Sequence, residues 1–426
     1  MTRRRVRVNW FWVTILGILI IIGMYVDRFV VPTIPPPFVP TPTPTRSPES
    51  FVTEAQAMFK QGKLLQAIDL YKGALTANPR DDAVYVAMAQ TQVFAGLYKD
   101  AQASAEEALL INPNNSMAHA VRAWALDFQD DIPDAMDSIN RALTLDPNNG
   151  IAHAYYVEIL VDSQDYTNLT KAADESRIAL SLAPNTIEAN RARGYILEAT
   201  GNYEEAIQYY QAAVAINDNI PDLHIALGRT YKYLSVYDKA IQEFTRANAL
   251  NPSDPTPDLL ISRTEATIGE FAKASQYAET AMKDLPTDPS LRGNYGVMLY
   301  YNLDWPNAAV QLGLAVNGGT ADDGSVVEKI PFSTDTRVVE YYYTYALTLA
   351  RLNRCNEALQ VAQLILSRAP ADDNAVSQAN KAIGICQSNL SATATPTVPA
   401  PLSTVPPVTP SAIPSDTPVP TYTPTP

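Results

Sequence analysis

The stretch GNYEEAIQYYQAAVAIND, residues 201–218, has a counterpart 34 residues further along the chain, SVYDKAIQEFTRANALNP, residues 235–252. The two share a skeleton of one small, one aromatic and one further small residue: Ala206, Tyr210 and Ala213 in the first, Ala240, Phe244 and Ala247 in the second. Self-similarity at a fixed interval of about 20–50 residues is typical of arrays built from one repeated structural unit.

The same interval extends over most of the chain. Two alanines seven residues apart recur in eight successive segments: Ala67 and Ala74, Ala101 and Ala108, Ala135 and Ala142, Ala172 and Ala179, Ala206 and Ala213, Ala240 and Ala247, Ala274 and Ala281, Ala308 and Ala315. A proline follows most of these pairs: Pro79, Pro113, Pro147, Pro184, Pro252 and Pro286. One interval lengthens to 37 residues because DYTNLTK, residues 165–171, holds three extra residues.

Pairing of helices explains this pattern. Alanine lets two helix axes approach closely, and a large residue such as Tyr71 fills the space beside the contact. Glycines stand where each first helix must turn into the second, a place that favours a positive φ: Gly62, Gly96, Gly201 and Gly269. Because one hairpin cannot bury its apolar face alone, neighbouring hairpins must stack.

These residues resemble tetratricopeptide repeats, over roughly four-fifths of the chain. The predicted units are 48–81, 82–115, 116–149, 150–186, 187–220, 221–254, 255–288, 289–318 and 339–372. A closing helix is expected at 375–390. The resemblance implies an all-α fold, a right-handed α-solenoid of about nine helical hairpins that spans residues 48–390.

Residues 319–338 interrupt the array between its eighth and ninth units. One interpretation is an excursion at a helix–helix connection. The other is a loop that folds over the concave face of the array and gates it.

The N-terminal segment predicts a membrane anchor. Residues 1–9 hold four arginines, and an apolar run follows at 10–26. Extended through residues 29–31, a transmembrane signal anchor over 10–31 would measure about 33 Å, roughly the thickness of the bilayer hydrocarbon. A cleaved signal peptide is the alternative, but residues 22–32 lack a small-x-small cleavage site. The positive-inside rule then predicts a single-pass protein of the cytoplasmic membrane, with its basic N-terminus cytoplasmic and its repeats outside.

Two Pro/Thr-rich segments flank the array. Residues 32–47 are predicted to form an extended, semi-rigid linker, because proline lacks a backbone donor and fixes φ. Residues 391–426 have a similar composition and almost no charge, which is typical of a disordered tail.

Composition and motifs limit the function. A net charge of −14 over 426 residues argues against a nucleic-acid surface. The sequence holds no Gly-rich phosphate loop, nucleophile elbow or His-Glu-x-x-His motif, so we predict no enzyme activity and no cofactor. The three histidines, His119, His153 and His224, are expected to pack in the core. Metal ligation is the alternative, although no third ligand accompanies them.

Cys355 and Cys386 are the only cysteines. One follows the turn of the last unit and the other ends the closing helix, and in stacked hairpins these two ends lie on one edge. A disulfide there would contribute roughly 3–4 kcal/mol in the chain-entropy model. Two free, buried thiols are the alternative.

In tetratricopeptide repeats the first helix of each unit lines a concave groove. The resemblance places these aromatic residues inward: Phe94, Trp124, Phe128, Tyr195, Tyr233, Tyr300, Tyr301 and Tyr343. A basic centre consists of Arg191, Arg229, Lys232 and Arg263, with Asp127, Glu158 and Asp162 toward its N-terminal side. Such a centre suggests an acidic or C-terminal carboxylate ligand with aromatic anchors beside it. The alternative is a solvated face with local acid–base pairing.

The sequence therefore predicts a membrane-anchored, extracytoplasmic scaffold that binds a protein or peptide in its concave groove. The alternative is a cell-envelope assembly factor whose exposed tyrosines stack on the sugar rings of a glycan. Saturable binding of a peptide, or retention on a polysaccharide, would separate the two.

Overall fold

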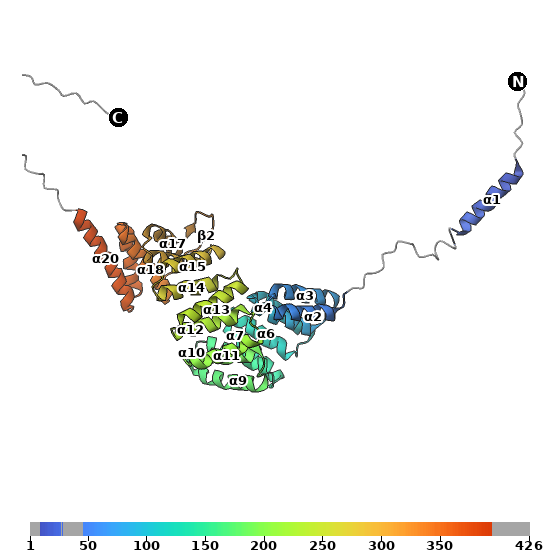
Figure 1. Cartoon of the computed structure of the whole chain (residues 1–426), viewed down its shortest axis with the longest axis horizontal. Helices are drawn as coiled ribbons and strands as arrows, with labels where there is room; N and C mark the ends of the chain where they lie inside the picture. The colour runs from blue at the N-terminus through green and yellow to red at the C-terminus, as the bar shows by residue number, and fades with distance from the viewer. Residues whose placement is uncertain (1–8, 27, 29–45, 394–426) are drawn as a thin grey trace, which may run out of the picture. The chain divides into compact units, whose positions relative to one another are not determined.

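The computed structural model describes residues 9–26, 28 and 46–393. Within them the chain is an all-α array of helical hairpins (Figure 1), as the repeat predicts. The chain divides into two compact units, an N-terminal unit Met1–Thr264 and a C-terminal unit Glu265–Pro426.

Six hairpins lie wholly in the N-terminal unit, and each pairs a first helix with a second. Their bounds are α2 Pro48–Lys60 with α3 Leu64–Ala77, α4 Asp82–Phe94 with α5 Tyr98–Ile111, α6 Ser116–Asp127 with α7 Ile132–Leu145, α8 Gly150–Asp162 with α9 Leu169–Leu182, α10 Ile187–Ala199 with α11 Tyr203–Ile216, and α12 Pro221–Tyr233 with α13 Tyr237–Leu250. The three extra residues of the fourth unit form a short 3-10 turn, Tyr166–Asn168, before α9.

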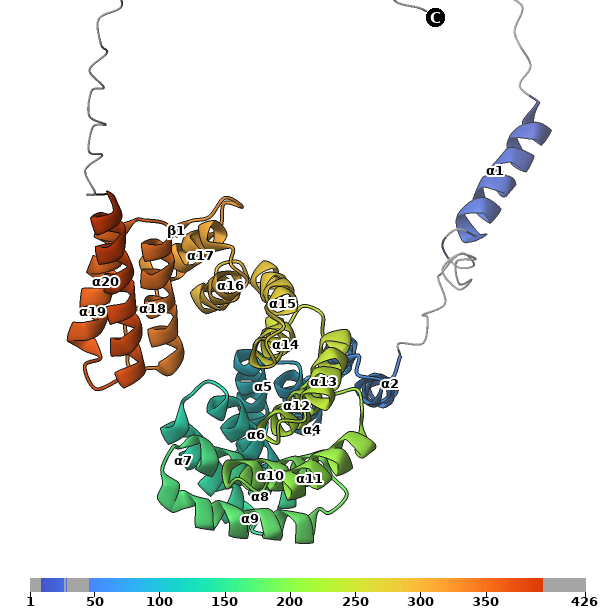
Figure 2. The same ribbon diagram turned by 60° about the vertical axis from the view of Figure 1, so that its left-hand side comes forward.

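The remaining hairpins begin with α14, which contains the boundary between the units. Their bounds are α14 Pro255–Thr267 with α15 Phe271–Asp284, α16 Pro289–Tyr301 with α17 Trp305–Asn317, and α18 Thr336–Arg351 with α19 Cys355–Arg368. The closing helix α20 spans Asp373–Thr393 and contacts both α18 and α19. Figure 2 shows these three helices side by side.

Small residues form the contact inside each hairpin. All sixteen alanines of the skeleton are at most 1% exposed. The same contact explains two helical glycines, since a Cβ on Gly194 would lie 2.8 Å from the ring of Tyr210, and one on Gly228 would lie 2.6 Å from the ring of Phe244. A glycine therefore stands where its partner helix carries an aromatic ring.

The turns inside the hairpins use one backbone conformation. Positive φ occurs at the four predicted glycines, with φ between 72° and 89°: Gly62, Gly96, Gly201 and Gly269. The other five hairpins place a non-glycine residue there, with φ between 55° and 66°: Asp130, Gln164, Ser235, Leu303 and Asn353. In the first turn the amide of Lys63 donates to the carbonyl of Met58 at 2.9 Å, which closes the end of the first helix.

The N-terminal unit closes on itself. The side-chain amide of Asn217 donates to the carbonyl of Phe59 at 3.3 Å, and that of Asn219 donates to the carbonyl of Lys60 at 3.1 Å. These bonds join the end of α2 to the turn between α11 and α12, across about 158 residues of chain. The first and fifth hairpins therefore touch, and the first helices face a shared interior.

The insertion lies at the connection between α17 and α18. It contains a two-stranded antiparallel ladder, β1 Gly319–Thr320 with β2 Val326–Val327, and α18 begins at Thr336, earlier than the predicted ninth unit. The buried Arg292 of α16 donates to Asp323 at 3.2 Å and to Ser325 at 2.8 Å. These contacts fasten the insertion to the array.

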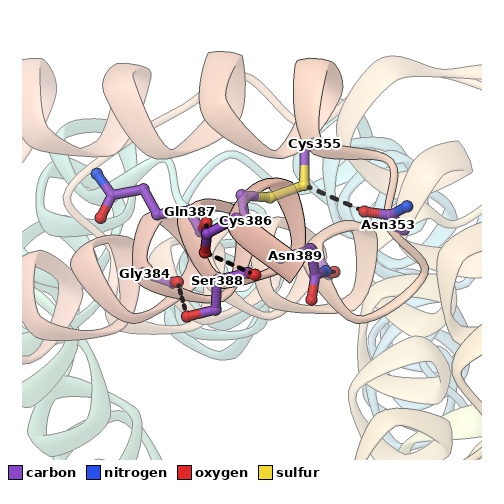
Figure 3. The surroundings of a disulfide bond; sticks show 9 residues. Asn353, Cys355, Gly384, Cys386, Gln387, Ser388 and Asn389 are labelled. Atoms are coloured by element: carbon purple, nitrogen blue, oxygen red, sulfur yellow. Dashed lines mark hydrogen bonds between the residues drawn. A yellow bond between two sulfur atoms is a disulfide. The ribbon is translucent and has the colours of Figure 1, made fainter. Parts of the chain in front are cut away.

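Cys355 and Cys386 are joined by a disulfide, with 5.4 Å between their Cα atoms (Figure 3). The bond connects the first residue of α19 with the closing helix α20. Asn389, also on α20, donates its side-chain amide to the carbonyl of Ala350 at 3.2 Å. The last helix is therefore tied to both helices of the ninth hairpin.

The predicted localisation is contradicted. The α-helix at the N-terminus, α1, spans Trp10–Tyr25. Its 16 residues measure about 24 Å, shorter than the roughly 30 Å of bilayer hydrocarbon. Among the described residues, no helix is both long enough and apolar enough to cross a membrane. The prediction of a span over 10–31 counted on residues 29–31, which lie outside the described part of the chain.

Three further sequence predictions fall mainly on residues that the structure does not describe. They concern the basic N-terminal residues 1–9, most of the linker 32–47, and the tail 391–426 beyond the end of α20.

Candidate functional site

The first helices of the N-terminal unit carry a row of aromatic rings along its interior. Phe59 and Phe94 meet edge to face at 5.6 Å, and Phe94 meets Trp124 in the same way at 5.0 Å. Trp124 then stacks on Tyr155 at 4.3 Å. The row runs from α2 through α4 and α6 to α8. We call the interior-facing side chains of the first helices, α2, α4, α6, α8, α10 and α12, the inner surface.

Arg191 of α10 lies at the centre of the inner surface. Its guanidinium pairs with Glu158 at 3.0 Å and with Asp222 at 3.1 Å. It also lies over the rings of Trp124 and Phe128, at 5.3 Å and 5.6 Å from their centroids. Trp124 donates its indole N–H to the same Glu158 at 2.8 Å, so one carboxylate joins residues from three first helices.

A second set of pairs lies beside this one. Arg229 of α12 forms a two-point contact with Glu198 of α10, which also accepts a hydrogen bond from Tyr210 at 2.9 Å. Tyr195 donates to Asp162 of α8. Each of these bonds links helices of one hairpin or of adjacent hairpins, so the polar residues hold the array together.

Some carboxylates of the inner surface are buried with too few hydrogen-bond donors and cations around them. Burial, with smaller contributions from Asp162 and Glu158, raises the pKa of Asp127 to about 9. Burial also raises the pKa of Glu158 to about 7, although Arg191 and the Trp124 N–H lower it in part. One carboxylate oxygen of Asp127 and one of Glu158 are buried without a hydrogen-bond partner. The predicted basic centre therefore lies among at least as many carboxylates.

Two clefts open beside Phe94. The larger, of about 370 Å³, is lined by Gly62, Leu64, Leu65, Phe94, Leu97, Pro221, Leu250 and Ser253, among others. The smaller, of about 80 Å³, is lined by Phe94, Tyr98, Trp124, Phe128, Asp222 and Asp254, among others. Residues of the first two hairpins form one wall, and the segments around Pro221 and Asn251 form the other. Both clefts therefore exist because the N-terminal unit closes on itself.

The structure distributes the predicted groove residues over several environments. Phe94 and Trp124 are buried, Phe128, Arg191, Tyr195 and Arg229 are half-buried, and all six belong to the inner surface. Lys232 and Arg263 are half-buried, and Tyr233, at 56% exposure, stacks on Tyr203 at 5.1 Å. Tyr300, Tyr301 and Tyr343 belong to the C-terminal unit, where Tyr301 stacks on Phe271 at 5.2 Å.

The three histidines share a structural role that sequence reasoning missed. Each binds through Nε2 to the backbone carbonyl six residues earlier: His119 to Pro113 at 3.1 Å, His153 to Pro147 at 3.0 Å, and His224 to Asp218 at 3.0 Å. Asn190 and Arg292 make the same bond, to Pro184 at 3.0 Å and Pro286 at 2.7 Å. The constant interval of six residues to the end of the preceding unit was the signal in the sequence.

Glutamates engage the second ring nitrogen in two of these histidines. His153 lies 2.5 Å from Glu175, and His224 lies 2.7 Å from Glu243. Burial lowers the pKa of His153, but its bonds to Glu175 and to the Pro147 carbonyl outweigh burial and raise it. Burial lowers the pKa of His119. Among the described residues, no three histidine, cysteine or acidic side chains are grouped to hold a metal ion.

Comparison with known proteins agrees with the repeat. Sequence models of the tetratricopeptide repeat match residues 58–125 and 187–220, which confirms that the chain contains such repeats. No curated protein matches this sequence significantly. Tetratricopeptide repeats point in general to scaffolds for protein–protein interaction.

Several solved structures are similar to this chain. A human IFIT1 dimer with PPP-AAAA is 16% identical with a TM-score of 0.53, over 81% of this chain and 83% of that chain. A tetratricopeptide repeat protein from Parabacteroides merdae is 16% identical with a TM-score of 0.40, over 59% of this chain and 98% of that chain. Pseudomonas aeruginosa pilF is 18% identical with a TM-score of 0.36, over 49% of this chain and 95% of that chain. At such identities the likeness to IFIT1 shows the fold alone.

Proposed function

We propose that this chain is a non-catalytic scaffold that binds a segment of a partner protein on the inner surface of its N-terminal unit. The observation that supports this most is the meeting of two clefts, of about 370 Å³ and 80 Å³, at Phe94. Buried aromatic residues next to a cleft are the usual anchors of a protein interface. The walls come from both ends of the closed unit, so a bound segment would contact the first two and the last hairpins together.

The polarity of the ligand follows from the pairing of the arginines. An acidic segment would have to displace Glu158 and Asp222 from Arg191, and Glu198 from Arg229. Displacing a buried carboxylate leaves it unpaired, at a cost of about 3–5 kcal/mol. We therefore propose that the partner binds at the apolar rim of the larger cleft and that Arg191 and Arg229 are structural residues.

We also propose that the chain catalyses no reaction and binds no nucleic acid. Its charge of −14 disfavours binding of a polyanion. Turnover of any substrate by the purified chain would contradict the first statement. Retention on single- or double-stranded nucleic acid at physiological salt would contradict the second.

Site-specific photo-crosslinking tests the scaffold proposal. Leu65 lies on the rim of the larger cleft and is 64% exposed, whereas Leu110 of the same unit is 78% exposed and does not line it. A photoreactive phenylalanine analogue would replace each leucine in the full chain in its host cells. We expect a discrete protein adduct from position 65 and not from position 110. Equal adducts from both positions, or none from position 65, would contradict the proposal.

A second candidate function rests on one exposed ring. Tyr233 stacks on Tyr203 with an interplanar angle of 15° and leaves more than half of its surface free, which is the geometry of a platform for a sugar ring. Tyr233→Ala would weaken the binding of a glycan. A substitution that fills the cleft at Phe94 would leave glycan binding unaffected. Soluble oligosaccharides that leave the fluorescence of the wild-type chain unchanged would exclude this candidate.

A further inference from the structure

A third cleft of the N-terminal unit, of about 260 Å³, lies on another side of Phe94 and holds an acidic residue. Its lining residues are Gln56, Phe59, Lys60, Tyr71, Ala87, Gln90, Thr91, Phe94 and Glu188. Tyr71, Thr91 and Phe94 are buried and form the floor, whereas Gln56 and Lys60 are exposed and form the mouth. Eight of the nine residues come from the first two hairpins, and Glu188 alone comes from α10.

Glu188 lines this cleft and forms no close ion pair in the described part of the chain. Its carboxylate accepts a hydrogen bond from its own backbone amide, but no side chain that the structure describes donates to it. Arg191 lies one turn further along the same helix, but its guanidinium is held by Glu158 and Asp222. Burial raises the pKa of Glu188, and its own backbone amide and the charge of Arg191 offset this only in part.

The other walls suit a cationic group. Phe59 and Phe94 both line the cleft and meet edge to face at 5.6 Å. The face of an aromatic ring attracts a cation through its π-electrons. Gln56 and Gln90 add amide oxygens that can accept hydrogen bonds, although Gln90 also donates its amide to Tyr155 at 3.3 Å. A carboxylate, two aromatic rings and amide oxygens together form a recognised environment for an ammonium or a guanidinium.

We propose that this cleft binds the cationic side chain of a lysine or arginine in the partner segment, with Glu188 as its counterion. The inference rests on the proposed scaffold function and adds to it the chemistry of one anchor residue. A segment that enters from the larger cleft would pass Phe94, which lines both clefts. The cation would then supply the direct ion pair that Glu188 lacks in the described part of the chain.

Lys60, at the mouth of the cleft, allows a test in which a substitution should tighten ligand binding rather than weaken it. Lys60 lines the cleft and carries the same charge as the proposed ligand, and within the described residues no ion pair joins it to Glu188. Replacement of Lys60 by glutamine removes this repulsion, so it should tighten binding of a cation. If Lys60 were instead the counterion of Glu188 in solution, Lys60→Gln would weaken the fold and leave ligand preference unchanged.

The experiment compares two peptide libraries on the immobilised full chain. Both contain nonapeptides with randomised flanks, one with a central arginine and the other with citrulline, the neutral isostere of arginine. We expect retention of arginine peptides to exceed that of citrulline peptides roughly 10-fold, as one charge-assisted contact predicts. Glu188→Gln should abolish this preference and Lys60→Gln should increase it. Glu107→Gln, at an exposed position outside the cleft, is the matched control.

Each of the other outcomes leads to a different conclusion about the anchor and the scaffold. Equal retention of the two libraries, or a preference that survives in Glu188→Gln, would overturn the cationic anchor while peptide binding itself supports the scaffold. Retention of neither library would also overturn the anchor, and the crosslinking at position 65 would then decide the scaffold function separately. Thermal unfolding of each variant, within about 2 °C of wild type, establishes that the fold is intact.

Discussion

Arg191 and Glu158 form an ion pair across two adjacent first helices, with 3.0 Å between Nη1 and Oε2. Their side chains are 12% and 3% exposed, and the indole of Trp124 donates to the same carboxylate. The pair thus connects the aromatic row of the inner surface to its charged residues, and it determines how both respond to mutation.

Removal of Arg191 should be costly. Arg191→Met leaves Glu158 buried without its cation, which we expect to lower the free energy of unfolding by about 3–5 kcal/mol in alkaline solution, where Glu158 is ionised, and by less at neutral pH, where it takes up a proton. The double variant Arg191→Met/Glu158→Gln should recover most of this loss, because no buried charge remains. Denaturant unfolding followed by circular dichroism measures both. Arg177→Met breaks the exposed pair with Asp174 and should cost less than about 1 kcal/mol. Equal effects of the two arginine variants would contradict this account.

His153 should make stability depend on pH. Its pKa is raised in the folded state, so its bonds to Glu175 and Pro147 contribute fully below the unfolded pKa, near 6.5, and are lost as pH rises through the folded pKa. In His153→Asn we expect the bond to the Pro147 carbonyl to persist, as the bond from Asn190 to Pro184 indicates, but the titration is gone. The wild type should therefore lose its advantage over the variant as pH rises above about 6.5.

His119 provides the control for that titration. Burial lowers its pKa, so protonation opposes folding and its effect on stability has the opposite sign. His119→Asn should accordingly gain relative to wild type as pH falls below about 6.5. Denaturation midpoints measured over this range check both variants, and parallel pH profiles for the two would refute the assignment.

The stabilities of two glycine variants test whether the N-terminal unit closes on itself. Gly62 and Gly96 have nearly equal φ, 72° and 75°, so alanine costs about 1–2 kcal/mol of backbone strain at either position. A Cβ at Gly62 would also lie 2.6 Å from the carbonyl oxygen of Asn219, whereas nothing lies within 4 Å at Gly96. Gly62→Ala should therefore destabilise by a further 1–3 kcal/mol, roughly the cost of overpacking. Identical unfolding curves for the two would mean that the unit is open in solution.

The disulfide should stabilise the C-terminal end of the array. Cys386→Ser removes a crosslink that spans 31 residues, and we expect a loss of about 3–4 kcal/mol in the exchange protection of α20. Hydrogen exchange read by mass spectrometry measures it. A reductant should produce the same loss in wild type and have no effect on the variant. Unchanged protection of α20 in the variant would show that packing alone holds the helix.

The hairpins could be predicted because each depends on local residues. Ala206 and Ala213 report a close helix contact, and Gly201 reports a turn with positive φ, whatever the rest of the chain does. Leu303, which has φ 66° at an equivalent turn, was not recognisable, because its conformation is imposed by the hairpin against its own preference.

The site was less predictable because it depends on contacts between hairpins. Arg191 was placed in a basic centre from its position on a first helix, but its pairing with Glu158 and Asp222 requires the spacing between three hairpins. The bond between Asn217 and Phe59 depends on the small rotation between units, added over five of them. The predicted membrane span failed for a different reason, since it relied on apolar composition beyond the end of helix α1.

The most direct test of the scaffold is hydrogen exchange on the full chain with and without the partner that crosslinking identifies. The account predicts that the partner slows exchange in the segments that line the clefts at Phe94, residues 56–66, 90–98 and 250–254, and leaves α20 unchanged. Protection confined to the second helices, or to the C-terminal unit, would contradict binding at the inner surface.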